Sequence, residues 1–213
     1  MHIVAISDTH GGHNNIVLPE CDILIHSGDY GNSKNNSKKE FIDFVCWFEK
    51  QPAKYKIFIS GNHDYFTQDN KEEALRFLKE KDIIYLEDTS VVIEGFKIHG
   101  SPWCPNFYNW AYMKEEGDLY NIFSKTIDRD IDILITHTPP HKILDKTLYG
   151  VNAGSKALKE VSKELKNLKL HIFGHIHESS GKIQIGQTIF CNAASLGRRH
   201  FTLEKTPYKS IDL

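Results

Sequence analysis

Five short clusters of polar side chains recur along the chain, and each directly follows an apolar run. Their histidine, aspartate and asparagine side chains are donors that divalent metal ions take in proteins. The pair His175 and His177 is the most informative, because two imidazoles two residues apart behind a strand point the same way and can chelate one ion. In chain order, the clusters read DTH (8–10), GD (28–29), GNHD (61–64), TH (136–137) and GHIH (174–177).

Taken singly, each cluster also fits an ordinary turn. An Asp after a strand often caps a turn, and a lone pair of histidines is equally compatible with a structural role. Taken together, the five clusters lie at the carboxyl ends of predicted strands, where α/β sheets place their ligand sites. Five unrelated turns would not be expected to share this position. We therefore predict that the clusters converge on one metal centre.

The apolar runs that precede the clusters are rich in Ile and Val, which predicts buried strands. These strands are expected over residues 2–7, 22–27, 55–60, 132–137 and 170–175. Apolar residues three or four apart predict helices over 37–48, 71–81, 115–127 and 155–168, of which the first opens with a capping-box sequence. Consecutive strands over 83–100 and 182–204 predict antiparallel additions and a second sheet. The expected fold class is therefore α/β, or α+β in some schemes.

Length and composition set further limits. A chain of 213 residues with 40% apolar residues predicts a single domain over 1–213. The net charge of −2 provides no global field for nucleic acid or an anionic membrane, so we expect no dedicated nucleic-acid surface and no membrane association. Without a secretory leader or a membrane-length apolar run, a soluble, cytoplasmic protein is expected. The four cysteines lack close pairing, which predicts reduced thiols in partly buried positions.

The order of the five clusters resembles the calcineurin-like metallophosphoesterase superfamily. The segments GSPWCPNFYNWAY (100–112), THTPPHKILD and GHIHESSG resemble more closely the branch of metallophosphoesterase-domain-containing proteins first described from brain. This resemblance implies a four-layer fold, in which a mixed β-sandwich of two sheets is flanked by helices. It also implies a phosphoester hydrolase with two metal ions.

Carried over by motif position, the resemblance implies that Asp29 bridges the two ions. One ion would be held by Asp8, His10, Asp29 and His177, and the other by Asp29, Asn62, His137 and His175. Two divalent ions bring four positive charges and the two carboxylates two negative ones, so about two net positive charges remain for a phosphate. The donor set, without thiolate, accommodates Mn, Fe, Zn, Co or Ni, and we expect Mn²⁺ to support activity in vitro.

The remaining members of the third cluster suggest a catalytic pair. A hydroxide that bridges the ions would be the nucleophile, and the resemblance implies that His63 donates a proton to the leaving group. Asp64 would keep His63 protonated, or would only close a tight turn. We expect a phosphodiesterase acting on nucleotide-like or cyclic diesters. The alternatives are a phosphomonoesterase and a non-catalytic regulator that binds nucleotide or metal.

Other residues carry alternative roles that the sequence leaves open. Trp103 lies in the aromatic-rich segment 100–112, which would either pack over the core or line a substrate pocket. Arg198 and Arg199 would brace a phosphate or lie at the surface, and His13 would rim the site or cap a turn. His26 and His141 are expected to hydrogen-bond to metal ligands. The resemblance implies the same role for Asn192, which would otherwise belong to a structural turn. The expected partner is a small-molecule phosphoester such as a nucleotide, and the oligomeric state is left open.

Overall fold

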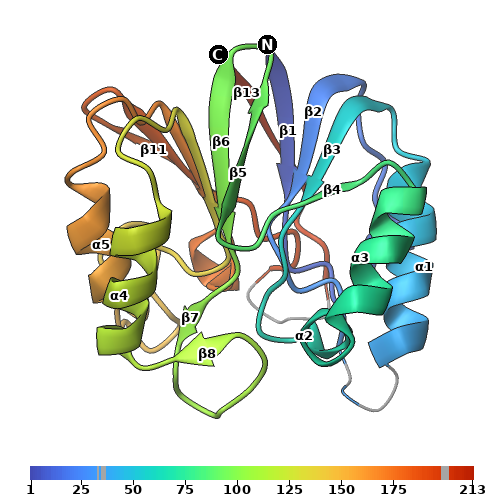
Figure 1. Cartoon of the computed structure of the whole chain (residues 1–213), viewed down its shortest axis with the longest axis horizontal. Helices are drawn as coiled ribbons and strands as arrows, with labels where there is room; N and C mark the ends of the chain where they lie inside the picture. Colours follow the sequence, from blue (N-terminus) through green and yellow to red (C-terminus); the bar gives the residue numbers. More distant parts are fainter. Residues whose placement is uncertain (33, 35–36, 198–201) are drawn as a thin grey trace.

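Two β-sheets face each other and are covered on their outer sides by helices. The computed structural model describes residues 1–32, 34, 37–197 and 202–213. Figure 1 shows α1 and α3 along the outside of one sheet, α2 at the lower end of that sheet, and α4 and α5 along the outside of the other. The expected four-layer arrangement of a mixed two-sheet sandwich flanked by helices is therefore confirmed.

The first sheet has five strands in the order β13-β1-β2-β3-β4. Its strands are parallel except β13, which runs antiparallel to β1. Their bounds are β1 His2–Ile6, β2 Cys21–His26, β3 Ala53–Phe58, β4 Ile84–Tyr85 and β13 Lys209–Asp212.

The second sheet has six strands in the order β11-β12-β10-β9-β6-β5. Its four central strands are parallel, and the two edge strands β11 and β5 each form an antiparallel hairpin with their neighbour. A separate ribbon pairs β7 with β8 below the sheets (Figure 1). The bounds are β5 Thr89–Ile93, β6 Phe96–Ser101, β7 Cys104–Pro105, β8 Met113–Lys114, β9 Ile133–Thr136, β10 Leu170–Phe173, β11 Gly181–Ile185 and β12 Thr188–Asn192.

The central strands are buried on both faces, which explains their continuous apolar sequences. In β1, Ile3 and Ala5 point into the core between the sheets, whereas Val4 and Ile6 point toward the helices. On the other sheet, Ile133 and Ile135 of β9 join the same central core. Because successive side chains of a strand point to opposite faces, each central strand contributes residues to two cores, one between the sheets and one beneath the helices.

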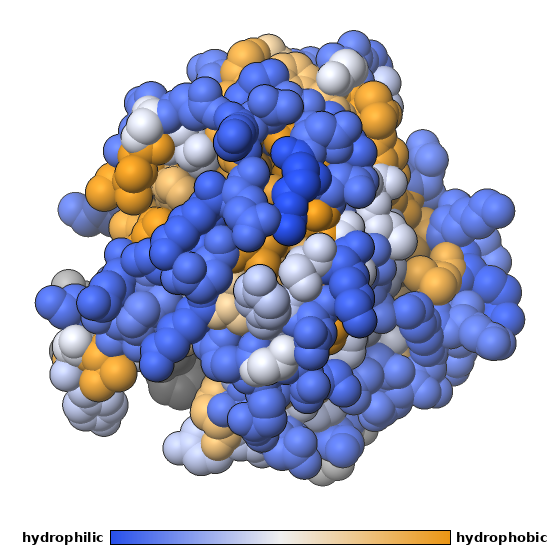
Figure 2. Space-filling view, turned by 60° about the vertical axis from the view of Figure 1, so that its left-hand side comes forward, coloured by the Kyte–Doolittle hydropathy of each residue, from blue (hydrophilic) through white to orange (hydrophobic). Residues whose placement is uncertain are grey.

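Helices cover the outer faces with apolar stripes. The first sheet is covered by α1 Ser37–Glu49, α2 Tyr65–Asp69 and α3 Lys71–Glu80, and the second by α4 Glu116–Thr126 and α5 Lys156–Ser162. Phe44 of α1 stacks on Tyr30 with ring centroids 4.9 Å apart. Leu119 and Phe123 of α4 are fully buried. The face that carries α4 and α5 is mostly hydrophilic, with apolar residues in small separate patches (Figure 2).

Several elements differ from the sequence predictions. The helix predicted over 155–168 ends at Ser162, because the chain continues in turns that still bury Leu165 and Leu168 and so keep the apolar spacing. The strands predicted over 83–100 divide between the two sheets. The range 182–204 contains β11 and β12, and the prediction missed β13, a short strand in which only Ile211 is fully buried.

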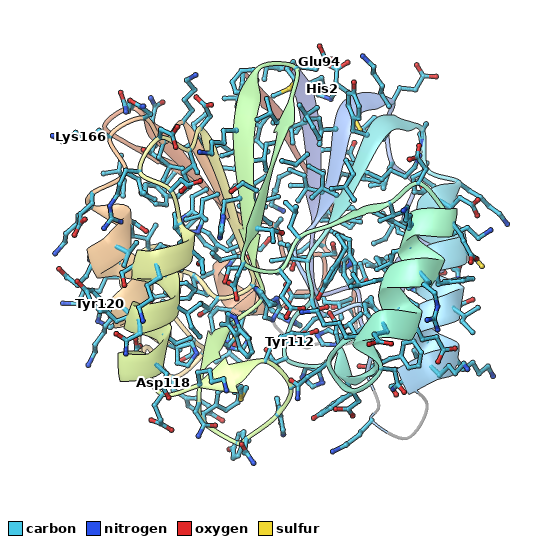
Figure 3. All side chains as sticks on the ribbon, viewed as in Figure 1. His2, Glu94, Tyr112, Asp118, Tyr120 and Lys166 are labelled. Atoms are coloured by element: carbon cyan, nitrogen blue, oxygen red, sulfur yellow. The ribbon has the colours of Figure 1, made fainter. Side chains whose placement is uncertain are left out.

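The parallel strands of both sheets end at one edge of the molecule. Figure 1 shows both chain termini at the opposite end from α2 and the β7–β8 ribbon. In Figure 3, His2 and Glu94 lie at that far end, whereas Tyr112 lies between the two halves near the ribbon. The carboxyl ends of β1, β2, β3, β9 and β10 are therefore gathered on the ribbon side.

The buried His171 of β10 makes stability depend on pH. Burial lowers its pKa from 6.5 to about 3, and its Nε2 donates to Thr136 Oγ1 at 2.9 Å. The unfolded chain takes up a proton below pH 6.5 that the folded chain does not, so stability falls as pH decreases from 6.5 toward 3. His171→Gln keeps a donor but removes this titration. We expect the slope of unfolding free energy against pH, measured by denaturant titration between pH 6.5 and 4.5, to decrease by about 1.4 kcal/mol per pH unit. An unchanged slope would contradict the assignment.

Candidate metal centre

The five sequence clusters meet at this edge. Each follows one parallel strand: the cluster at 8–10 follows β1, 28–29 follows β2, 61–64 follows β3, 136–137 ends β9, and 174–177 follows β10. Because the two sheets face each other, loops from both sheets contribute to one site. The structure brings together all seven residues expected as metal ligands. They form overlapping groups whose donor atoms lie within 4.8 Å of one another, with Asn62 hydrogen-bonded to His137.

The backbone at the site is bent sharply. Asp8, His10, Asp29 and His175 all have positive φ, between 40° and 68°. This conformation is costly for residues other than glycine, at about 1–3 kcal/mol each, and it turns each side chain toward the edge. Gly174 allows the close approach, since a Cβ there would lie 2.1 Å from the Asp8 carboxylate. Four of the seven expected ligands therefore carry local backbone strain.

The first donor group lies between the loops after β1 and β10. The Asp8 carboxylate accepts the backbone N–H of His175 at 3.0 Å, and its Oδ1 lies 3.3 Å from His177 Nε2. His10 donates from Nδ1 to the Gly31 carbonyl at 2.9 Å, so Nε2 carries the lone pair. That Nε2 lies 3.8 Å from Asp29 Oδ2.

The second donor group joins the loops after β2, β3 and β9. His137 donates from Nδ1 to the Ser27 carbonyl at 2.8 Å, which leaves Nε2 to face the site. That Nε2 lies 3.2 Å from Asp29 Oδ2 and 3.0 Å from Asn62 Oδ1. The His175 ring lies against the His137 ring, with centroids 5.1 Å apart. Asp29 thus borders both groups, as a bridging ligand would.

The pKa values of the buried side chains reflect their short distances from one another. Burial raises the pKa of Asp29, but the His137 and His63 rings outweigh it and hold the pKa well below its ordinary value. Burial lowers the pKa of His137, but the charge of Asp29 outweighs it and raises the pKa to about 9. Burial lowers the pKa of His175 to about 3. Metal binding at His137 therefore has to displace a proton.

The donors fit divalent metal ions. Backbone carbonyls hold the Nδ1 protons of His10 and His137, an arrangement that orients imidazole ligands of metals. Imidazole, carboxylate and amide donors suit first-row transition metals. Asp8, His10, Asp29 and His177 would hold one ion, and Asp29, Asn62, His137 and His175 the other.

His63 lies at the border of the centre. Its backbone N–H donates to Asp29 Oδ1 at 2.7 Å. Its ring contacts the His10 ring edge-on, with centroids 4.9 Å apart, and lies 4.7 Å from the Trp110 ring. The ring also lines the cavity in front of the centre. A proton donor at this position would face a bound molecule.

Asp64 does not occupy the expected position beside the His63 ring. Its carboxylate accepts four backbone N–H groups at 2.7–3.2 Å, and among the described residues the His63 ring is not one of its partners. The four donors come from Asp29, Tyr30, Gly31 and Gly61. Burial and the charge of Asp29 raise the pKa of Asp64, whereas the amides lower it. Because two amides occupy each oxygen, the ionised form fits this geometry. Asp64 therefore ties the loop after β2 to the loop after β3, and the expected contact with the His63 ring is absent.

A cavity of about 640 Å³ opens in front of the donors. Phe107 and Trp110 form an aromatic wall, while Trp103 is not among the lining residues. Trp103 instead donates to Asp88 at 2.7 Å and packs against Tyr112. The many aromatic residues of the segment 100–112 did indicate that aromatic side chains line a cavity. The sequence offered no means of choosing which aromatic side chains face inward.

The other sequence candidates that the structure describes contact residues outside the proposed ligand set. His26 accepts the Gly28 N–H and donates to Thr9 Oγ1, so it links the loops after β1 and β2. Asn192 donates to the Ile176 carbonyl, between the two histidines of the last cluster. His13 and His141 instead contact acidic side chains, at 2.9 Å from Asp43 and 3.6 Å from Asp145, respectively. Arg198 and Arg199 lie outside the described residues.

Comparison with known proteins agrees with this arrangement. The sequence profile described as calcineurin-like phosphoesterase matches residues 1–179, a range that contains every cluster of the centre. The chain belongs to the calcineurin-like phosphoesterase family. The family hydrolyses phosphoesters and generally depends on divalent metal, and the resemblance inferred from the five clusters is confirmed.

Relatives of this calcineurin-like phosphoesterase include proteins of the expected branch. Human metallophosphoesterase domain-containing protein 1 is 34% identical, with 90% of this chain and 65% of the relative covered. UPF0046 protein K07C11.7 of Caenorhabditis elegans is 32% identical, with 93% and 71% covered. The chain thus spans about two thirds of the length of the human relative.

Solved structures share the fold at low sequence identity. The phosphopantetheinyl hydrolase PptH from Mycobacterium tuberculosis superimposes with a TM-score of 0.67 at 14% identity, covering 98% of this chain and 95% of that one. The protein TT1561 of Thermus thermophilus gives 0.65 at 15% identity, covering 91% and 88%. Within the described ranges of this phosphoesterase, each helix is too short or too polar to span a lipid bilayer.

The amide-binding role of Asp64 can be tested by Asp64→Asn. The NH2 group that replaces one carboxylate oxygen cannot accept hydrogen bonds, so the two buried N–H groups on that oxygen lose their partner, at about 1–3 kcal/mol each. We expect the unfolding free energy to fall by about 2 kcal/mol or more, and metal affinity to fall about 10- to 100-fold as Asp29 loosens. Denaturant titration and metal-binding calorimetry measure the two effects. Asp69→Asn, on the exposed surface of α2, is the matched control. Equal effects of the two substitutions would refute the role.

Proposed function

We propose that this protein is a dinuclear metal-dependent phosphodiesterase that acts on nucleotide-like or cyclic diesters. The observation that supports it most is the position of Asp29, whose Oδ2 lies between His10 Nε2 and His137 Nε2 at 3.8 and 3.2 Å. A carboxylate between two imidazoles from different loops is suited to bridge two cations. When bound, the ions supply Lewis acidity toward the phosphate and lower the pKa of the water that is the proposed nucleophile.

The charge balance supports a phosphate substrate. Asp8 and Asp29 are the two carboxylates of the proposed ligand set, and Asn62 contributes an uncharged amide oxygen. With two divalent ions, about two net positive charges remain. A carboxylate at position 62 would neutralise one of these charges and weaken the attraction for a phosphoryl group. The amide at Asn62 is therefore part of the proposed substrate binding.

His63 is the proposed general acid. Its backbone N–H on Asp29 fixes the residue beside the centre, and its ring reaches the cavity next to Trp110. From there the imidazolium can donate a proton to the leaving oxygen as the P–O bond breaks. Asp64 is engaged by amides, and the carboxylate that lies within 4.8 Å of a His63 ring nitrogen is that of Asp29.

The aromatic wall supports a nucleotide-like substrate. Phe107 and Trp110 line the cavity, and base–aromatic stacking contributes about 1–3 kcal/mol per base in nucleic-acid complexes. A cavity of about 640 Å³ is within the usual range for small-molecule sites. The proposed location is the cytoplasm, which agrees with the four free thiols.

The enzymatic class is tested with bis(p-nitrophenyl) phosphate and added Mn²⁺. We expect the wild-type protein to turn over this diester and Asp29→Asn to lose more activity than the roughly 10- to 100-fold typical of outer-shell changes, because both ions lose a ligand. Asp118→Asn, on the outer surface of α4 (Figure 3), should retain activity. Metal binding without turnover by the wild type would favour the non-catalytic alternative. Faster turnover of the corresponding monoester would favour a phosphomonoesterase.

The role of His63 is tested by varying the leaving group. A poor leaving group such as an alkoxide needs protonation, so His63→Gln should reduce kcat about 10²- to 10⁴-fold on a cyclic nucleotide. Nitrophenolate leaves without a proton, so the same variant should lose far less on the chromogenic diester. Steady-state kinetics on both substrates separates the two cases. Equal losses on the two substrates would indicate that His63 orients the phosphate instead.

A further inference from the structure

A buried thiol lies among the donors of the second group. Cys104 of β7 is fully buried, and its Sγ, a ring nitrogen of His137 and a ring nitrogen of His175 all lie within 4.8 Å of one another. Cys104 Sγ is also 3.9 Å from Asn62 Oδ1. The thiol therefore faces three residues of the proposed second ion site, although the motif resemblance assigns it no role.

The spacing fits donors that share one ion. Zn–N and Zn–O bonds are about 2.0–2.2 Å and Zn–S bonds about 2.3 Å, which places two donors of a tetrahedral sphere about 3.3–3.7 Å apart. The distance from His137 Nε2 to Asn62 Oδ1 is 3.0 Å, and the thiol lies 3.9 Å from the same oxygen. These two distances lie just below and just above that range, which is close to the spacing of donors that share one cation.

The thiol is held in place by its backbone rather than by strong side-chain partners. The Cys104 N–H donates to the Tyr112 carbonyl at 2.8 Å, within the β7–β8 ribbon. The Tyr112 N–H in turn donates to Gln68, which anchors the ribbon next to α2. Among the described residues, the Sγ contacts are long ones, to Asn62 Oδ1 and to the Pro102 carbonyl at 3.8 Å. A positioned sulfur with weak partners is available for a metal.

We propose that Cys104 is a further, thiolate ligand of the ion held by Asp29, Asn62, His137 and His175. On binding, the S–H bond breaks, the electron pair of sulfur is donated to the cation, and the proton leaves to solvent. This inference depends on the proposed metal centre but not on catalysis. It departs from the expectation that the donor set contains no thiolate.

A thiolate changes the chemistry of this position in two ways. Sulfur is a soft donor, so the second position should bind Zn²⁺ or Co²⁺ in preference to Mn²⁺, whereas the first position, which has no sulfur donor, should discriminate less. The thiolate also reduces the net charge of the loaded centre from about +2 to about +1. A phosphodiester carries one negative charge and a monoester about two at neutral pH, so the lower charge favours the diester.

The test is the absorption spectrum of the Co²⁺-loaded protein. Thiolate ligation gives a sulfur-to-cobalt charge-transfer band in the near ultraviolet, and we expect this band in the wild type and its loss in Cys104→Ser. Cys191→Ser is the matched control, because Cys191 is the other fully buried cysteine and lies in the core between the sheets. This variant should keep the band. Cys104→Ser should also lose preference for Zn²⁺ over Mn²⁺ in competition dialysis.

A second measurement uses only the wild-type protein, so it does not depend on whether a variant folds. Zinc-edge X-ray absorption of the wild type should show one sulfur about 2.3 Å from the metal. Bound Co²⁺ or Zn²⁺ without a sulfur ligand would refute the thiolate, as would a band that Cys191→Ser abolishes. Protein that binds no metal would refute both this inference and the proposed function. Protein that shows the sulfur ligand but hydrolyses no ester would remove only the proposed function.

Discussion

The carboxylate of Asp29 is the interaction on which the site depends. One oxygen accepts the His63 N–H, and the other lies near His10 and His137, which follow strands of different sheets. Placing a buried carboxylate here requires a left-handed backbone at Asp29 and a second carboxylate, Asp64, that binds the surrounding amides. The cost of this strain and burial is offset by the hydrogen bonds and by the cations that the donors fit.

The sandwich explains why such a site can exist. The parallel strands of each sheet deliver their carboxyl ends to one edge, and the core between the sheets, with residues such as Ile25 and Ile135, fixes their relative position. Polar loops then cover the edge without disturbing the apolar layers. Small residues permit the closest contacts: at Gly61, a Cβ would lie 2.4 Å from Asp29 Oδ1. The same rigidity holds the β7–β8 ribbon, and with it Cys104, against the donors.

Asp64 shows how far neighbouring residues in sequence can differ in role. His63 and Asp64 are adjacent, yet one ring faces the cavity and the other side chain points into the protein, where it accepts N–H groups from two loops. The expectation of a direct pair followed from adjacency alone. Both oxygens of the Asp64 carboxylate are already occupied by four backbone N–H donors. The conformation of the turn therefore fixes these hydrogen-bond partners, and none of the four is an imidazole.

The sequence by itself determined the strand and helix pattern, the α/β sandwich and the family, because buried parallel strands leave continuous apolar runs and the ligand types recur directly after them. Tertiary structure decided what depends on side-chain direction and distant pairing. It placed Trp110 rather than Trp103 at the cavity, directed Asp64 to backbone amides, added β13 to β1, and brought Cys104 beside His137. These outcomes follow from contacts between segments far apart in the chain, which local composition does not encode.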